Sequence, residues 1–158
     1  MKHIEVERKF LVKSDTYKRE VKSRTKIIQG FLNTDPERTV RVRIRGDEGY
    51  LTVKGKSNAT GTTRFEWEKE IRYKEAASLI DLCEPSVLEK IRFEVSVGKH
   101  IFEVDEFLGL NKGLVVAEIE LQHENEAFEK PDWLGEEVTG QIKYYNSQLS
   151  KKPYSNWK

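Results

Sequence analysis

The sequence TVRVRIR, residues 39–45, alternates β-branched apolar residues with arginines. Successive side chains of a β-strand point to opposite faces, so Arg41, Arg43 and Arg45 share one face of a strand and the apolar residues share the other. We therefore predict a strand over Thr39–Arg45 with one cationic face, formed by the three arginines.

Seven further segments alternate in the same way. Glycine-rich connections at 46–49 and 98–99 predict hairpins, which make neighbouring strands antiparallel. Eight antiparallel strands in a small domain form either a sandwich or a closed barrel. Short helices are expected over Ser14–Glu20, Lys74–Cys83 and Gly140–Leu149. The other predicted strands are Ile4–Val12, Lys26–Leu32, Tyr50–Lys56, Arg64–Tyr73, Val87–Val97, His100–Phe107 and Leu114–Gln122.

The charges of these strands are sorted by sign. The segments at 39–45 and 50–56 carry cations, those at 100–107 and 114–122 carry carboxylates, and three others mix both. A sheet with one solvated face also alternates polar and apolar residues. Exposed ion pairs, however, contribute only about 0–1 kcal/mol, so a solvated face gains little from such sorting. The sorting favours a barrel whose charged rows face one another.

Such an interior implies a ligand. An eight-stranded barrel has room for side chains or one small ligand, and so many charges would be too costly in a dry core. Carboxylates suit a hard cation such as Mg²⁺ or Mn²⁺, and arginines and lysines suit phosphate oxygens. Together they indicate a metal–polyphosphate complex. The apolar faces, including Phe65, Trp67, Phe93 and Phe102, should then point outward beneath the helices.

Composition narrows the class of protein. With 158 residues, 35% of them charged, the chain is expected to form a single domain over residues 1–158. The start of the sequence does not resemble a signal peptide, so none is expected. No apolar run is long enough for a membrane span, and the net charge of +1 gives no basis for nucleic-acid binding. A single cysteine, Cys83, favours a cytoplasmic location. A homodimer is compatible with the chain, although no segment argues for one.

The N-terminal motif Glu5-Val6-Glu7-Arg8-Lys9 resembles the ExExK signature of the CYTH superfamily, the triphosphate tunnel metalloenzymes. The resemblance extends in order along nearly the whole chain, and the length is similar to that of short bacterial tripolyphosphatases. The further matching elements are Gln29-Gly30-Phe31-Leu32, Arg41-Val42-Arg43, Leu51-Thr52-Val53-Lys54, Arg64-Phe65-Glu66-Trp67-Glu68, Lys90-Ile91-Arg92, Glu103-Val104-Asp105, Ala117-Glu118-Ile119-Glu120 and Tyr145-Asn146.

This resemblance implies a mainly β fold, an eight-stranded antiparallel tunnel with a few peripheral helices. It also implies dependence on a divalent metal, Mg²⁺ or Mn²⁺, and a small triphosphate as substrate. By matching positions, Glu7, Lys9 and Glu120 are the expected catalytic residues. Asp105, with Glu66, Glu68 and Glu103, is expected to orient the cations or to hold a second metal. The principal metal set is Glu5, Glu7, Glu118 and Glu120, and the phosphate set is Lys9, Arg41, Arg43, Lys54, Arg64, Lys90 and Arg92.

The expected reaction is hydrolysis of inorganic tripolyphosphate to diphosphate and phosphate by a metal-activated water. The alternatives are a nucleoside or thiamine triphosphatase, an adenylyl cyclase, and a module that binds polyphosphate or a nucleotide without turnover. No base-recognition segment supports a cyclase, and the acidic residues would repel the ligand of a pure anion binder. Phe31 stands where many family members have Tyr, so no mechanism that uses a hydroxyl there is expected for this chain.

Overall fold

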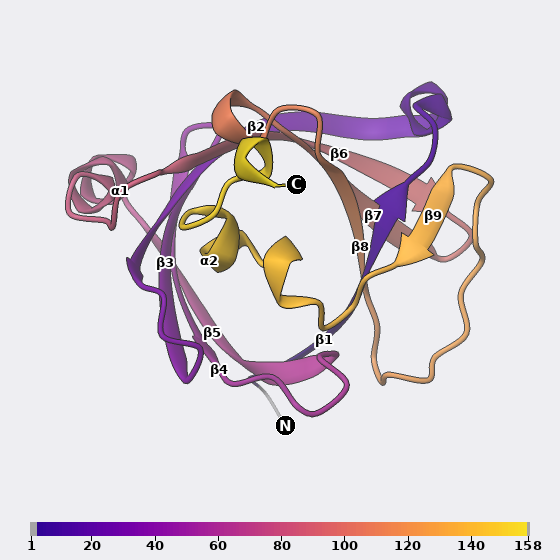
Figure 1. Ribbon diagram of the computed structural model, residues 1–158, viewed down its shortest axis with the longest axis horizontal. Helices are drawn as coiled ribbons and strands as arrows, with labels where there is room; N and C mark the ends of the chain where they lie inside the picture. The colour runs from indigo at the N-terminus through magenta and orange to yellow at the C-terminus, as the bar shows by residue number, and fades with distance from the viewer. Residues whose placement is uncertain (1–2, 158) are drawn as a thin grey trace.

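The computed structural model describes residues 3–157, so Met1, Lys2 and Lys158 of the predicted domain lie outside the described residues. Within this range the chain forms one antiparallel sheet in the order β5-β4-β3-β2-β6-β7-β8-β1-β9, and β5 also pairs with the start of β1 (Figure 1). That pairing closes eight strands into the predicted barrel. The strands are β1 (Ile4–Val12), β2 (Val21–Asn33), β3 (Arg38–Arg45), β4 (Glu48–Gly55), β5 (Thr63–Ile71), β6 (Leu88–Val97), β7 (His100–Phe107), β8 (Val115–Glu120) and β9 (Leu134–Glu137).

All eight predicted strands are present, and the bounds of β1 and β7 are those predicted. The largest difference is in β2, which begins at Val21 rather than Lys26 because its first residues pair with the end of the long strand β6. The short strand β9 was not predicted. Its sequence, Leu-Gly-Glu-Glu, does not alternate, and it pairs with the end of β1 through Phe10↔Glu137 and Val12↔Leu134.

The first two predicted helices form on the outside of the barrel. The one expected over Ser14–Glu20 is a 3₁₀ helix, η1 (Thr16–Glu20), and Ser14 does not cap it. The helix expected over Lys74–Cys83 is α1 (Tyr73–Ile80), which buries Ala76 against Val42 and Ile44 of β3. No described helix is long and apolar enough to cross a membrane.

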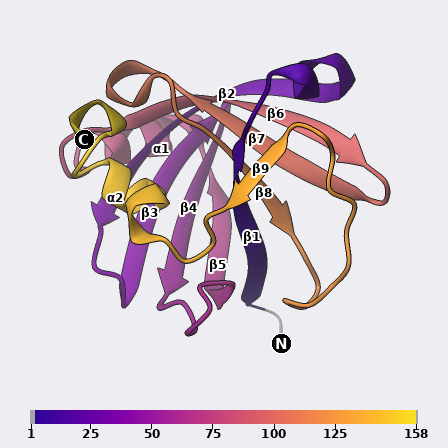
Figure 2. The ribbon, with the colours of Figure 1, turned by 45° about the vertical axis from the view of Figure 1, so that its right-hand side comes forward.

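The third predicted helix, Gly140–Leu149, is wrong as a continuous element. Tyr145 has an extended backbone (φ −68°, ψ 135°) and divides the segment into η3 (Ile142–Tyr144) and α2 (Asn146–Leu149). These turns are not peripheral, because they lie across one end of the barrel (Figures 1 and 2). Tyr144 and Leu149 are buried there in an apolar cluster with Phe31. The remaining 3₁₀ turns are η2 (Gly109–Asn111) and η4 (Tyr154–Asn156).

A long connection between β8 and β9, residues 121–133, runs outside the barrel (Figure 1), where its Leu121, Phe128 and Trp133 pack in an apolar cluster. We call this segment the strap. Its Trp133 is buried against Phe102, with ring centroids 5.3 Å apart, and against Tyr17 of η1 at 5.8 Å. Tyr17 of η1 packs on Phe93 with ring centroids 5.7 Å apart, whereas Phe102 is covered by Phe128 and Trp133 of the strap. The expectation that helices cover both residues is therefore wrong for Phe102. Phe65 was also expected beneath a helix, but its side chain remains 44% exposed.

Candidate active site

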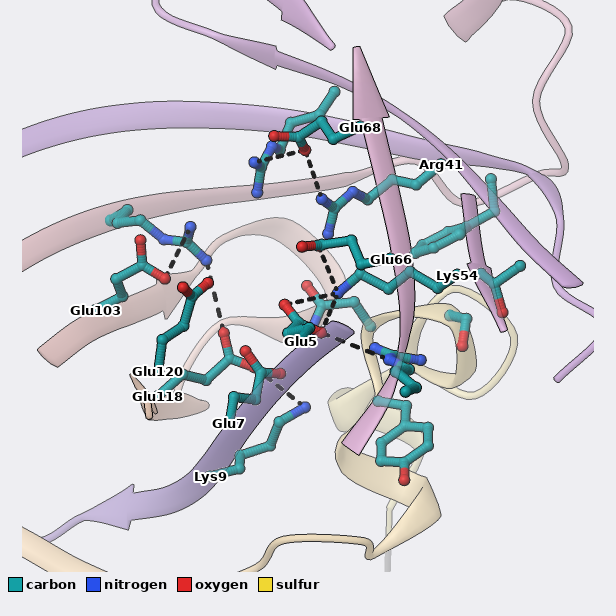
Figure 3. Close-up of a pocket in the computed structure, with 18 of the residues that line it drawn as sticks. Glu5, Glu7, Lys9, Arg41, Lys54, Glu66, Glu68, Glu103, Glu118 and Glu120 are labelled. Atoms are coloured by element: carbon teal, nitrogen blue, oxygen red, sulfur yellow. Dashed lines mark hydrogen bonds and ion pairs between the residues drawn. The ribbon is translucent and has the colours of Figure 1, made fainter. Parts of the chain in front are cut away.

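The charged rows of the strands face one another inside the barrel, as their alternation predicted. They line a cavity of about 250 Å³ (Figure 3). Figure 3 shows carboxylates and cationic groups from different strands pointing toward one another across this space. The structure thus brings together all but one of the predicted site residues, the exception being Asp105. Those lining the cavity are Glu5, Glu7, Lys9, Arg41, Arg43, Lys54, Arg64, Glu66, Glu68, Lys90, Arg92, Glu103, Glu118 and Glu120.

Three carboxylates cluster where β1 and β8 run side by side. Glu5, Glu7 and Glu120 each place an oxygen within 4.8 Å of the others, and Glu7 and Glu120 are direct partners across the two strands. Burial, followed by the nearby carboxylates of Glu118 and Glu5, raises the pKa of Glu7 well above its usual range. Clustered carboxylate oxygens are the ligands that Mg²⁺ and Mn²⁺ prefer, so the donor set fits a divalent cation.

Glu120 is the most exposed member of this cluster. Burial in the tunnel and then the carboxylates of Glu5 and Glu103 raise the pKa of Glu120 to about 7. Glu5 differs because it faces cations, with Lys54 Nζ at 3.1 Å and Arg64 Nε at 3.7 Å from its Oε1. Burial opposes ionisation of Glu5, but these two cations outweigh it and lower its pKa. The cluster therefore combines one firmly ionised carboxylate with two that hold protons more tightly.

Two arginines of β3 share one carboxylate of β5. The Nη2 atoms of Arg41 and Arg43 lie 3.3 and 3.4 Å from Oε2 of Glu68, which also accepts a 2.7 Å hydrogen bond from the Thr52 hydroxyl. The Nε–H groups of both arginines are buried and have no hydrogen-bond partner among the described residues. Burial, then the charges of Arg41 and Arg92, lowers the pKa of Arg43 to about 9. This cationic cluster has unused donors and would be stabilised by an anion.

Two strands along the sheet from these arginines, Lys90 and Arg92 of β6 converge on Asp105 of β7. Asp105 accepts hydrogen bonds from Nε and Nη2 of Arg92 at 2.8 and 2.9 Å, and Lys90 Nζ lies 2.8 Å from its Oδ2. Burial opposes ionisation of Asp105, but Arg92 and Lys90 outweigh it and lower its pKa. Asp105 therefore lies behind the cations that line the cavity and outside the three-carboxylate cluster.

Glu118 lies between the two kinds of group. Its oxygens are 3.4 Å from Lys9 Nζ and 3.8 Å from Arg92 Nη2. Burial opposes its ionisation, yet Lys9, Arg92 and Lys90 hold the pKa of Glu118 well below its usual range. Figure 3 shows Glu118 beside Glu7 and Lys9, so Glu118 connects the acidic cluster to the cations of the cavity.

Sequence reasoning assigned no role to the residues that close one end of the cavity. Tyr145, Asn146 and Ser147 line it from the C-terminal segment. The ring of Tyr145 is 5.1 Å from Lys9 Nζ and 5.7 Å from the Arg64 guanidinium, within the range of cation–π contacts. Tyr145-Asn146 was part of the family resemblance, but strand alternation carries no information about residues in such a turn.

Comparison with known proteins agrees with this geometry. The CYTH domain model matches residues 3–154. An inorganic triphosphatase of Acetivibrio thermocellus is 50% identical over 155 residues, which cover 98% of this chain and 97% of that protein. An inorganic triphosphatase of Nitrosomonas europaea is 33% identical over 151 residues, covering 92% of this chain and 96% of that protein.

Solved structures show the same architecture. The crystal structure of the inorganic triphosphatase NE1496 aligns with a TM-score of 0.64 at 32% identity, covering 92% of this chain and 93% of that one. A protein from Hippeastrum described as a putative adenylyl cyclase with a dominant triphosphatase activity is only 12% identical, with a TM-score of 0.54 and coverage of 77% of this chain and 80% of that one, and shares the fold. From the full-length match and the charged tunnel together, we conclude that this chain belongs to the CYTH domain family.

Proposed function

We propose that this protein is a divalent-metal-dependent triphosphatase whose preferred substrate is inorganic tripolyphosphate. The observation that carries the proposal is the meeting of two opposite clusters in one enclosed cavity. Three carboxylates crowd within 4.8 Å on one wall, and two arginines on another have buried, unused Nε–H donors. A metal–polyphosphate complex supplies the charge that each cluster lacks. The two triphosphatase relatives described above, at 50% and 33% identity, support the same activity.

The cationic residues would bind the phosphate chain. Arg41 and Arg43 offer planar guanidinium groups that suit paired phosphate oxygens, while Lys54 and Lys90 act as point charges. Glu68 holds Arg41 and Arg43 in place before a ligand arrives, and Asp105 holds Lys90. Because these cationic groups are already oriented, they would need little rearrangement to stabilise the negative charge that develops on the phosphate oxygens during the reaction. The full proposed phosphate set is Lys9, Arg41, Arg43, Lys54, Arg64, Lys90 and Arg92.

Glu5, Glu7 and Glu120 would hold the metal, with Glu118 beside them. A bound Mg²⁺ or Mn²⁺ would polarise phosphate oxygens and favour ionisation of a nearby water. Glu7 and Glu120, whose pKa values are raised, would release protons when the cation binds. Lys9, 3.4 Å from Glu118, would stabilise the leaving phosphate oxygen by donating a hydrogen bond to it.

The size of the cavity favours a compact inorganic substrate. Its volume of about 250 Å³ lies below the roughly 300–1,000 Å³ of pockets for drug-sized ligands. One end is closed by Tyr145, Asn146 and Ser147, which occupy space that a nucleoside entering there would require. These features favour tripolyphosphate over ATP or thiamine triphosphate. An adenylyl cyclase would have to hold a ribose and a base as well.

The test is a phosphate-release assay of the purified protein with tripolyphosphate, ATP and thiamine triphosphate, each with Mg²⁺, with Mn²⁺ and with EDTA. We expect release from tripolyphosphate that requires the metal, and much slower release from the other two. Glu5→Gln and Glu120→Gln should abolish release while circular dichroism remains unchanged. Tight binding of tripolyphosphate without any release would favour the non-catalytic module instead.

We also propose a cytoplasmic location, since Cys83 is a free thiol, as is usual in reducing compartments.

A further inference from the structure

Lys90 is held from two sides within the barrel. Its Nζ lies 2.8 Å from Oδ2 of Asp105 and donates a 2.8 Å hydrogen bond to Oδ1 of Asn146. Asp105 belongs to the barrel wall, whereas Asn146 is the first residue of α2, in the segment that crosses the end of the barrel. An ammonium group has three N–H donors. Asp105 and Asn146 take two of them, so one remains for a ligand in the cavity that Lys90 lines.

Lys90 also fixes the orientation of the Asn146 amide. An ammonium group can only donate, so the atom of Asn146 that faces it must be the oxygen. The same oxygen lies 2.9 Å from Nε2 of Gln29, a residue of β2. Gln29 must therefore turn its NH₂ group toward Asn146, and the orientation of one amide determines that of the other.

This orientation has a cost at Gln29. The side chain is fully buried, and its Oε1 has no hydrogen-bond partner among the described residues. An unpaired buried acceptor typically costs about 1–3 kcal/mol. A methionine would fill a similar volume without that penalty. The stability of the barrel therefore does not explain a glutamine here, whereas its bond to Asn146 does.

The C-terminal segment does not depend on Gln29 for its attachment. Leu149 and Tyr144 are buried in the apolar cluster that contains Phe31 and Leu88, and Lys9 Nζ donates to the carbonyl of Tyr144 at 3.3 Å. These contacts hold the segment across the barrel. The Gln29–Asn146 hydrogen bond therefore orients the Asn146 amide and is not needed to attach the segment.

We propose that Gln29 and Asn146 are positioning residues that aim the remaining N–H donor of Lys90 at a phosphate group bound in the tunnel. Gln29 holds the Asn146 amide, and Asn146 with Asp105 holds the ammonium group. Lys90 itself contacts the substrate. The inference assumes the proposed phosphate site and does not depend on turnover, so binding and hydrolysis can be tested separately.

The experiment is a double-mutant cycle of wild type, Gln29→Met, Asn146→Ala and the double variant. The dissociation constant of tripolyphosphate is measured by calorimetry without metal, and kcat/KM is measured with Mn²⁺. Each single substitution should raise the dissociation constant of tripolyphosphate and lower kcat/KM about tenfold, the size expected for losing one hydrogen bond to a charged group. The double variant should be no worse than the poorer single variant, because both changes break the same relay. Gln148→Met, in α2 but outside the cavity lining described here, is the matched control and should behave as wild type.

A merely structural role would give a different pattern. Gln29→Met should keep or raise the melting temperature, since it removes the unpaired oxygen. Unchanged affinity in Gln29→Met, losses that multiply in the double variant, or an equal loss in Gln148→Met would each overturn the proposal. If Gln29→Met does not fold, Gln29→Leu decides, because it also removes the hydrogen bond to Asn146 without adding a charge and should weaken binding by a similar factor. Unchanged affinity in Gln29→Leu would refute the relay. A wild type that binds tripolyphosphate but releases no phosphate would refute the proposed hydrolysis and leave this test intact.

Discussion

Arg92 and Asp105 form a paired ion contact in the wall of the tunnel, with Nε 2.8 Å from Oδ1 and Nη2 2.9 Å from Oδ2. Both side chains are buried, and Lys90 contacts the same carboxylate at 2.8 Å. Asp105 is thus engaged by the protein's own cations, and its position behind them leaves the cavity to other carboxylates. Of the two roles expected for Asp105, this geometry favours orientation of the cations over metal binding.

Asp105→Asn separates the two roles. Removing one partner of a buried ion pair leaves uncompensated charge, so the free energy of unfolding should fall by about 3–5 kcal/mol. Urea denaturation measures this loss. The affinity for Mn²⁺, measured by calorimetry, should change little, whereas Glu120→Gln should weaken it strongly. An equal loss of Mn²⁺ affinity in both variants would make Asp105 a metal ligand.

A second prediction concerns the stability that the ligand-free protein loses by burying several cations together at the proposed phosphate site. Arg43 is buried beside Arg41 and Arg92, and its pKa is lowered to about 9. The lowered pKa means that the folded protein disfavours the charged form of Arg43. Removing Arg43 would not leave Glu68 unpaired, because Glu68 keeps its contacts with Arg41 and the Thr52 hydroxyl. Arg43→Met should therefore raise the melting temperature of the ligand-free protein. It should also lose most of the further increase that tripolyphosphate gives the wild type.

The same strand supplies a control for this experiment. Arg38 lies on β3, but its side chain is 64% exposed and pairs with Asp35 at the surface. Arg38→Met removes the same charge without touching the cavity, so the thermal shift caused by tripolyphosphate should match that of wild type. A similar loss of that shift in both variants would mean that net charge, rather than the position of Arg43, controls binding.

Strand alternation predicted the barrel because it follows directly from backbone geometry. Arg41 and Arg43 had to share a face wherever the strand lay, and the sorting of charge between strands favoured an interior over a solvated face. The inward orientation of Glu5, Lys54 and Glu118 followed in the same way. Alternation gives no distances between side chains on different strands. The ion pairs of Asp105 with Arg92 and Lys90 were therefore apparent only in the three-dimensional structure.

The elements that alternation missed lie where the chain leaves regular structure. Tyr145 adopts an extended backbone inside what its neighbours predicted as one helix, and this break places Asn146 beside Lys90. The strap likewise has no periodicity, and its path is determined by aromatic packing of Trp133 on Phe102. Such segments depend on tertiary contacts, which a local pattern does not encode.

A third prediction tests the strap as a part of the core. Trp133 is 3% exposed and packs against Tyr17, Phe102 and the surrounding apolar cluster. Trp133→Ala should lower the free energy of unfolding by about 3–5 kcal/mol, as large-to-small core substitutions of aromatic residues do. Urea denaturation gives the value. Because Trp133 lies outside the tunnel, kcat/KM measured well below the melting temperature should remain near wild type; a large loss would connect the strap to the active site.

The last prediction is a pH dependence of metal binding that comes from Glu120. Its pKa of about 7 lies above the value of 4.5 for an ordinary glutamate. The folded, metal-free state therefore holds this proton more tightly than the unfolded state does. The resulting stabilisation is fully present below about pH 4.5 and is lost as the pH rises through about 7.

Metal binding must displace this proton. The affinity for the metal should therefore increase with pH, whereas the stability of the metal-free protein decreases. The dissociation constant of Mn²⁺ should rise as the pH falls below about 7, up to tenfold per pH unit for each proton displaced. Calorimetric titrations at pH 6 in buffers of different ionisation enthalpy count the released protons. The wild type should release more protons per ion than Glu120→Gln at that pH. Equal proton release by the two proteins would show that Glu120 is already ionised before the metal arrives, and would remove it as the source of the dependence.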